Sequence, residues 1–242
     1  MDEVSVLFSG GSDSTLAVAR VCERFERVHL LTYQHSAMFF VDKSQVNVER
    51  LRRKFGEDKF THKIIDIDDL FQSILYGNPT QRFSDIRKYG TYLSACFCGA
   101  CKLAMHTRTI TYNLRNKIQF SCDGSNKGSV PYFPDAVCKE ELKNFYARFG
   151  IGYNNPIWEY DGKTLRSDEA LFRLGITPRK EVKFPAEIQV FSTQHSCLDG
   201  FHHIYVRGYY LLRYGAEAFK RASAAYYKDK MEICGNYIEK HL

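Results

Sequence analysis

Six consecutive residues near the start of the sequence have the types and the order that could bind a pyrophosphate: Ser9, Gly10, Gly11, Ser12, Asp13 and Ser14. The glycines let the main chain turn successive amides toward one point, and a helix that begins there adds its partial positive charge. The serine hydroxyls can donate to phosphate oxygens. An acidic side chain beside an expected anion is unusual, so Asp13 indicates either a magnesium contact or a helix cap.

A second short segment combines an acid, a glycine, a hydroxyl and an amide: Asp123, Gly124, Ser125 and Asn126. Its acidic or amide side chain could hold a ribose or a metal ion. The same residues are also typical of an ordinary Asp-Gly turn, and both interpretations stay open. The sequence lacks the GxxxxGK pattern of loops that serve γ-phosphate hydrolysis, so that reaction is not expected.

The chain has eight cysteines and no export signal, which argues against disulfides and favours ligand or redox chemistry. Cys98 and Cys101 have the CxxC spacing that lets two thiolates converge on one metal centre. Two ligands are too few, and the best third candidate is Cys197. Cys96 is a further thiol that could belong to the set.

A structural zinc site is the main alternative for these thiols. It would use Cys96, Cys98 and Cys101, completed by Cys122 or His106. A redox or disulfide-relay pair is the other alternative. Residue spacing leaves the choice open.

Hydrophobic periodicity predicts strands and helices in alternation. The expected strands are Glu3–Phe8, Val28–Thr32, Phe60–Asp66 and Ile118–Asp123. The expected helices are one with Val18, Val21, Cys22 and Phe25 on its inner face, then Lys43–Phe55, Asp68–Tyr76, Cys98–Asn116, Lys139–Phe149 and Ser167–Leu174. Strands separated by helices imply a doubly wound parallel sheet. Ligands bind at the carboxyl ends of such strands, where the two turns should open.

Two regions have weaker patterns. Gly77–Thr91 is expected to be a loop, because Gly77, Asn78 and Pro79 interrupt the periodicity. The end of the chain is expected to be mainly helical, with one apolar stripe formed by Leu211, Ala218, Ala222, Ala225 and Tyr226.

The composition is that of a globular protein: of 242 residues, 44% are hydrophobic and 26% are charged. A net charge of +6 favours an anionic partner, which a nucleotide or tRNA would equally satisfy. No apolar run reaches the roughly 18 residues of a membrane span, and Met1, Asp2 and Glu3 do not resemble a signal peptide. We therefore expect a cytoplasmic protein without a membrane partner, and we allow for a homodimer.

The segment Ser9–Ser14 resembles the SGGxDS signature of the PP-loop ATP pyrophosphatase superfamily. The turn Asp123–Asn126 resembles a segment that borders the nucleotide in several of these enzymes, and looser similarity extends over most of Val4–Leu174. The resemblance implies an adenine nucleotide alpha-hydrolase-like, Rossmann-like α/β fold with a mainly helical C-terminal part. It implies an ATP-binding domain at residues 1–180, and residues 181–242 would be an extension that completes the site.

The cysteine pattern is similar to that of the iron-sulfur PP-loop enzymes that thiolate tRNA. That similarity implies a 4Fe-4S cluster held by Cys98, Cys101 and Cys197, with ATP and Mg²⁺ as the other cofactors. It also implies an ATP-dependent sulfurtransferase that adenylates a nucleobase carbonyl oxygen and replaces it with sulfur, with Asp13 and the three cysteines as catalytic residues. The compact chain favours a small acceptor slightly over tRNA, and the sulfur donor is open.

Two other functions stay open. One is a PP-loop ligase that uses an amine in place of sulfur and carries zinc as a structural ion. The other is a protein that binds ATP or a cluster without turnover.

Overall fold

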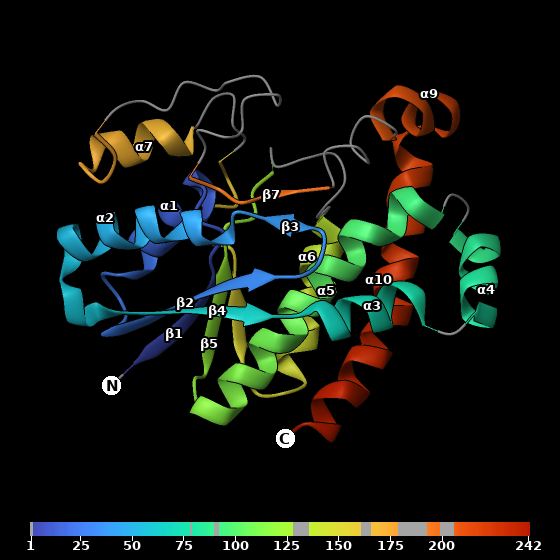
Figure 1. Ribbon diagram of the computed structural model, residues 1–242, viewed down its shortest axis with the longest axis horizontal. Helices are drawn as coiled ribbons and strands as arrows, with labels where there is room; N and C mark the ends of the chain where they lie inside the picture. Colours follow the sequence, from blue (N-terminus) through green and yellow to red (C-terminus); the bar gives the residue numbers. More distant parts are fainter. Residues whose placement is uncertain are drawn as a thin grey trace.

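The computed structural model describes residues 2–77, 79–89, 92–127, 136–160, 166–178, 193–198 and 206–242. The centre of the molecule is a parallel sheet with the strand order β4-β2-β1-β5-β6 (Figure 1). Its strands are β1 (Glu3–Leu7), β2 (Arg27–Gln34), β4 (Phe60–Asp66), β5 (Phe120–Asp123) and β6 (Gly152–Asn154). The four predicted strands are confirmed with small shifts at their ends, and β6 was not predicted. The doubly wound parallel sheet is therefore the observed fold class.

Helices cover both faces of the sheet. One face packs against α1 (Ser12–Val21), α2 (Gln45–Phe55) and α7 (Ser167–Arg173), which lie together above the strands in Figure 1. The other packs against α3 (Asp68–Tyr76), α5 (Tyr92–Asn116), α6 (Ala136–Ala147) and α10 (Ala216–Lys240). Burial on both faces is seen in β1, where every residue from Val4 to Leu7 is buried and the polar Ser5 bonds to Ser121.

The chain reverses its direction of sheet growth next to β1. It first adds β2 and β4 on one side of β1, and then returns to add β5 and β6 on the other side. The carboxyl ends of β1 and β5 are therefore neighbours at the switch point, where open α/β sheets bind their ligands. Both predicted turns begin at this point.

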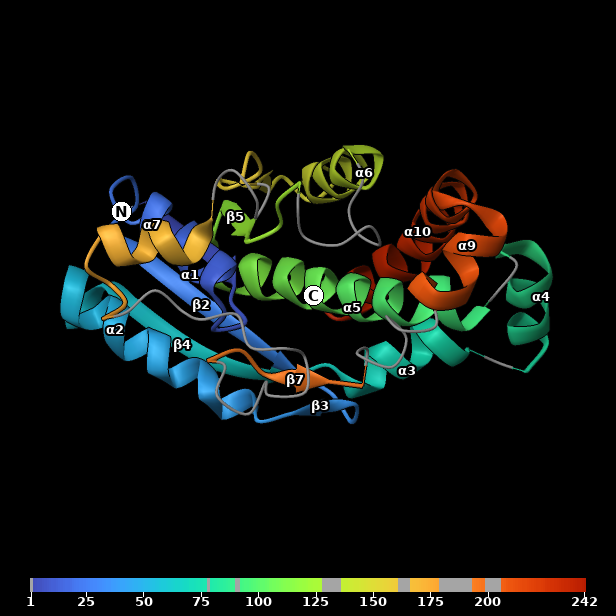
Figure 2. The ribbon, with the colours of Figure 1, turned by 90° about the horizontal axis from the view of Figure 1, so that it is seen from above.

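The prediction of a loop over Gly77–Thr91 is wrong for its central part, because Pro79–Tyr89 form α4. Proline is tolerated at the first helical position, where its missing N–H has no intrahelical partner. The helix is held against α10 by an ion pair between Asp85 and Lys230, with 2.6 Å between carboxylate and ammonium. Figure 2 shows α4 beside α10 at one end of the molecule. A tertiary contact thus outweighs the local turn signals.

Helix α5 begins at Tyr92 and not at Cys98, so the CxxC pair lies inside the helix. Gly99 would weaken an isolated helix, but Ala100, Leu103 and Ala104 are fully buried against the core. Packing of this face favours continuation of the helix through the glycine.

The C-terminal part is helical as predicted, with a π-helical turn at Val206–Tyr210, α9 (Leu211–Tyr214) and α10. The predicted apolar stripe is confirmed at Tyr226 alone, since Ala225 is exposed and Leu211, Ala218 and Ala222 are only partly buried. The buried stripe of α10 consists instead of larger residues, which pack toward α5: Phe219, Tyr226, Tyr227, Met231, Cys234 and Ile238. In the described part of the chain, no helix is long and apolar enough to cross a membrane.

Candidate active site

The segment Ser9–Ser14 leaves the carboxyl end of the central strand and enters α1. Gly10 has φ +77°, a backbone conformation that residues with a side chain rarely adopt. A Cβ added there would also lie 2.5 Å from the Cα of Ser44, which is too close. The N-cap of α1 is Gly11, and Asp13 lies in the first turn of the helix. Asp13 is therefore not the cap residue, which removes that interpretation and keeps the magnesium contact as a prediction.

Hydrogen bonds within the loop shape its turn. The hydroxyls of Ser9 and Ser14 lie 3.1 Å apart, and the amide of Gly11 donates to the Ser9 hydroxyl at 3.3 Å. Ser14 and Thr15 donate from their side chains to the carbonyl of Gly11, at 3.1 and 2.7 Å. The carbonyl at the end of the turn is thus held away from the side on which a phosphate would sit, as an anion site requires.

The second predicted turn packs directly onto the first. A Cβ added to Gly124 would lie 2.6 Å from the main-chain nitrogen of Ser14 and 2.8 Å from the carbonyl carbon of Asp13. Only glycine allows this approach between the end of β5 and the start of α1. The turn therefore belongs to the same site as the phosphate loop, and it is not merely an ordinary Asp-Gly turn that reverses the chain.

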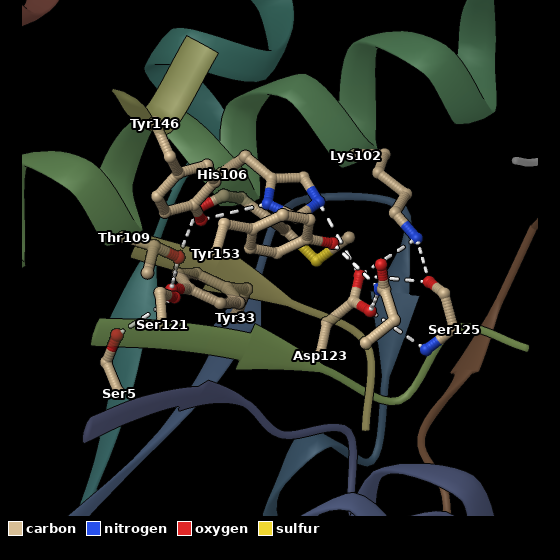
Figure 3. Close-up of polar contacts among 12 residues, drawn as sticks. Ser5, Tyr33, Lys102, His106, Thr109, Ser121, Asp123, Ser125, Tyr146 and Tyr153 are labelled. Atoms are coloured by element: carbon tan, nitrogen blue, oxygen red, sulfur yellow. Dashed lines mark hydrogen bonds and ion pairs between the residues drawn. The ribbon is translucent and has the colours of Figure 1, made fainter. Parts of the chain in front are cut away.

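Asp123 is the centre of a buried polar cluster at the end of β5 (Figure 3). The ammonium of Lys102 lies 3.2 Å from its carboxylate and donates to the hydroxyl of Ser125 at 2.5 Å. Ser125 donates to both carboxylate oxygens, from its amide and from its hydroxyl, at 2.9 Å each. The side-chain amide of Asn155 donates to the same carboxylate. Four donor groups, from Lys102, Ser125 and Asn155, therefore surround one buried acid.

Burial alone would raise the pKa of the Asp123 carboxyl. The ammonium of Lys102 and the hydrogen bonds from Ser125 outweigh burial and hold this pKa well below its ordinary value. Asp123 is thus an anion at neutral pH. Its position next to the phosphate loop would repel a nucleotide without the compensating charge of Lys102.

His106 lies one helical turn beyond Lys102 on α5, fully buried. Its Nδ1 is 2.9 Å from the hydroxyl of Tyr146, and its Nε2 is 3.7 Å from the carboxylate of Asp123. Burial lowers the pKa of His106 to about 3, although the nearby Asp123 carboxylate acts in the opposite direction. The imidazole is therefore neutral, and in the described part of the chain its Nε2 has no hydrogen-bond partner.

A segment from the last quarter of the chain lies over the phosphate loop. Positions for a Cβ on Gly10 and Gly11 lie 2.9 Å from the carbonyl oxygen of Thr193 and 2.8 Å from Oε1 of Gln194. The side-chain amide of Asn47 donates to the carbonyl of Gly10 at 2.7 Å and to the hydroxyl of Thr193 at 3.1 Å. The segment Thr193–Gln194, which shortly precedes Cys197, therefore lies against the phosphate loop.

The three predicted cysteine ligands come from two elements. Cys98 and Cys101 are one turn apart on α5, and Cys197 lies in β7 (Ser196–Cys197), opposite Met38 of β3 (Met38–Phe39). All three side chains are partly exposed. Among the described residues, no group of three or more His, Cys, Asp or Glu side chains is placed to hold a metal ion. The side chain of Cys96 lies outside the described residues.

Two residues of the zinc alternative have other surroundings. Cys122 is buried among apolar residues on the α1 side of the sheet, where burial raises the pKa of its thiol above its usual range. His106 lies on the α5 side and is engaged with Tyr146. These two side chains therefore face different layers of the molecule.

Sequence reasoning missed Lys102, counted Asn155 only within the looser resemblance to PP-loop enzymes, and considered His106 only as a zinc ligand. A signal existed, because Cys98, Lys102 and His106 recur every fourth residue and must share one face of a helix. No comparable signal marks Asn155, which reaches Asp123 only because β6 pairs with β5.

Comparison with models of protein families and with curated proteins finds no match. Among solved structures, a 4-thiouridine synthetase, in an RNA complex with bound ATP, is similar over 94% of this chain, with 14% identity and a TM-score of 0.52. The chain spans about half of that protein, 53% of its length. The chain has the adenine nucleotide alpha-hydrolase-like fold. At this identity the likeness concerns the fold alone, and it confirms the fold that the resemblance to PP-loop enzymes implies.

A second similar structure comes from Methanocaldococcus jannaschii and is described as a predicted subunit of tRNA methyltransferase. It covers 70% of this chain and 76% of its own, with 22% identity. Its TM-score of 0.44 is too low to show a common fold.

Proposed function

We propose that this protein is an ATP-dependent sulfurtransferase of the PP-loop type, which adenylates a carbonyl oxygen of a nucleobase in RNA and replaces it with sulfur. The observation that carries the proposal is the contact between Gly124 and Ser14. It joins a loop suited to pyrophosphate to a turn whose buried anion, Asp123, is paired with Lys102 of α5. That combination supports a site with separate places for the leaving phosphates and for the reacting atoms.

In the first step, the nucleobase oxygen attacks the α-phosphorus of ATP, and the bond to the pyrophosphate breaks. The amides at the start of α1 would bind the pyrophosphate as its charge develops. The ammonium of Lys102, held by Asp123 and Ser125, would stabilise negative charge on the α-phosphate. Asp13 would hold a magnesium ion, which neutralises the phosphates when it is bound.

In the second step, a sulfur nucleophile attacks the ring carbon, the carbon–oxygen bond to AMP breaks, and AMP leaves. Adenylation makes this possible because a phosphate ester is a far better leaving group than an oxide. Cys98 lies one turn before Lys102 on the same face of α5, which supports a role for this thiol in handling sulfur. The donor of the sulfur stays unassigned.

The 4Fe-4S cluster on Cys98, Cys101 and Cys197 stays a prediction. Since the described side chains form no metal-binding group, no step of the proposal depends on a cluster. Anaerobic purification tests it directly, because a cluster would give equal amounts of iron and acid-labile sulfide that are lost in each single alanine variant. Tight zinc without iron would instead support the structural zinc site.

The similar 4-thiouridine synthetase was solved with both ATP and RNA, which supports a nucleotide site and an RNA acceptor in a chain of the same fold. The preference for a small acceptor rests on chain length alone and gains no support from this likeness. We therefore choose RNA as the acceptor class.

The test is incubation with ATP and bulk tRNA plus a sulfide source, followed by measurement of AMP, pyrophosphate and nucleoside masses. We expect AMP and pyrophosphate, and a nucleoside heavier by the difference between sulfur and oxygen. Asp13→Ala should abolish both. Release of ADP and phosphate would contradict the PP-loop chemistry, whereas a product that has gained an amine would contradict thiolation alone.

A further inference from the structure

Two adjacent phenylalanines are exposed beside the phosphate loop. Phe39 ends β3 with 44% of its surface exposed, and Phe40 follows with 57% exposed. A single exposed aromatic residue needs no explanation. Two exposed rings at successive positions of the chain, at the carboxyl end of the sheet, offer flat apolar faces on which a ligand can stack.

Short connections link this pair to the site. From Phe40 the chain enters the 3₁₀ turn Val41–Ser44, and Ser44 is the residue whose Cα abuts Gly10 of the phosphate loop. On the other side, β3 pairs with β7, and Met38 is opposite Cys197. Phe39 and Phe40 therefore lie in the chain between Ser44, which abuts the phosphate loop, and Met38, which pairs with Cys197.

The backbone at Phe40 adopts a left-handed conformation, with φ 59° and ψ 41°. Residues other than glycine, asparagine and aspartate rarely do so, and aromatic residues pay for it in strain. Since the ring of Phe40 is mostly exposed, core packing does not explain why a phenylalanine occupies this position. Residues with strained backbone conformations cluster at active sites and ligand-binding sites.

Neighbouring side chains extend the surface. Because side chains alternate along a strand, Leu198 shares a face of the small sheet with Phe39, which is opposite Ser196. The ammonium of Lys43 lies 4.7 Å from the centre of the Phe40 ring. The carboxylate of Asp42 in the same turn is also exposed, so this turn has no net charge. Stacking, rather than contact with phosphate, must supply the affinity here.

We propose that Phe39 and Phe40 form a stacking platform for an unpaired base of the RNA acceptor, next to the site of adenylation. The proposal rests on the proposed function and specifies how that site receives its substrate. Small molecules are usually bound in concave pockets, whereas open aromatic surfaces suit single-stranded nucleic acid. The geometry therefore favours a base within a chain over a free nucleotide.

Binding of a fluorescent single-stranded oligouridine to the full chain, without ATP, tests the platform. Phe40→Ala should weaken binding about 10-fold to 100-fold, the usual effect of losing one base–aromatic stack, and Phe40→Trp should preserve it. Phe83→Ala is the matched control, because Phe83 is 75% exposed on α4 and should leave binding unchanged.

Phe40→Gly separates the ring from the backbone. Glycine adopts the left-handed conformation without strain, so this variant should be at least as stable as the natural chain and should still lose binding. Thermal unfolding measured beside the binding titration gives both results. Equal affinity in Phe40→Gly, Phe40→Ala and Phe83→Ala would overturn the platform. Competition by free UMP at the same concentration as the oligomer would overturn the choice of RNA.

Failure of the platform and failure of the proposed function give different results. If Phe40→Ala loses binding but no condition yields AMP, the proposed reaction is wrong and the platform stands. If AMP and thiolated RNA form and Phe40→Ala binds normally, the reaction stands and the platform is wrong.

Discussion

In the described part of the chain, two aspartate–lysine pairs are buried, and their surroundings differ. Asp85 and Lys230 join α4 to α10 with a direct contact of 2.6 Å, and the Lys230 ammonium also lies 5.5 Å from the centre of the Tyr226 ring. Asp123 and Lys102 lie at the end of β5 at 3.2 Å, against the phosphate loop. Each pair joins an aspartate to a lysine, and the side chains of both pairs are largely buried.

The two pairs differ in the hydrogen bonding of the polar atoms around them. Beside Asp123, Nε2 of His106 and Oδ1 of Asn155 are buried without a hydrogen-bond partner in the described part of the chain. The Asp85–Lys230 pair lies at the α4 end of the molecule, where Lys230 donates directly to the Asp85 carboxylate (Figure 2). Buried polar groups normally have partners, so a deficit next to a phosphate loop indicates a place for a ligand or water. We infer that one pair serves the fold and the other serves the chemistry.

The largest effect is expected on stability, from Lys230→Met. The substitution leaves Asp85 buried without its cation and should lower the free energy of unfolding by about 3 kcal/mol or more. Urea denaturation measures it. Asp85→Asn combined with Lys230→Met removes both charges and should recover most of the loss. AMP formation per folded molecule should stay unchanged, and a loss of activity in the double variant would break the comparison.

The next effect is expected on rate, from Asp123→Asn. The variant has the same shape but no charge, so Lys102 loses the anion that positions it beside the phosphates. AMP formation should fall about 100-fold, comparable to the loss of one preorganised electrostatic group. Circular dichroism should show an intact fold. A rate within a factor of three of the natural chain would remove Asp123 from the chemistry.

A third effect concerns pH. The folded chain keeps His106 neutral down to a pKa of about 3, whereas the unfolded chain protonates it below about 6.5. The unfolded state therefore binds more protons between these values, and stability falls as pH falls. His106 alone should cost about 2 kcal/mol between pH 7 and pH 5.

Denaturation of His106→Gln at both pH values tests this dependence. The slope should become shallower but not vanish, because burial also lowers the pKa of His35 to about 4. Asp123 does not contribute in this range, since its low pKa affects stability only at more acidic pH. An unchanged slope in His106→Gln would contradict the neutral buried imidazole.

The smallest effect is expected from Gly124→Ala, which moves the two turns apart. The added methyl carbon would lie 2.6 Å from the Ser14 nitrogen, so the loop must shift. ATP binding, measured by calorimetry, should weaken about 10-fold, or roughly 1.4 kcal/mol. Gly208→Ala is the control, because no atom lies within 4 Å of its Cβ position. Equal affinity in both variants would separate the second turn from the nucleotide site.

Local patterns predicted much of this fold. Strands such as Phe60–Asp66 and helices such as Asp68–Tyr76 have the expected bounds, because their periodicity agrees with their packing. Helix α4 and the buried stripe of α10 were predicted wrongly for one reason. Each depends on the other, through Asp85, Lys230 and the tyrosines between them, and a contact across 145 residues leaves no local signal.

The sequence by itself determined the phosphate loop, since the order of residues in Ser9–Ser14 requires a tight turn between a strand and a helix. It also determined that Asp123–Asn126 follows a strand. Only the tertiary structure decided that these turns touch, that Lys102 and Asn155 converge on Asp123, and that Thr193 and Gln194 lie over the loop. The reason is physical: a turn is specified by its own dihedral angles, whereas the neighbours of a buried charge are specified by the order of strands in the sheet.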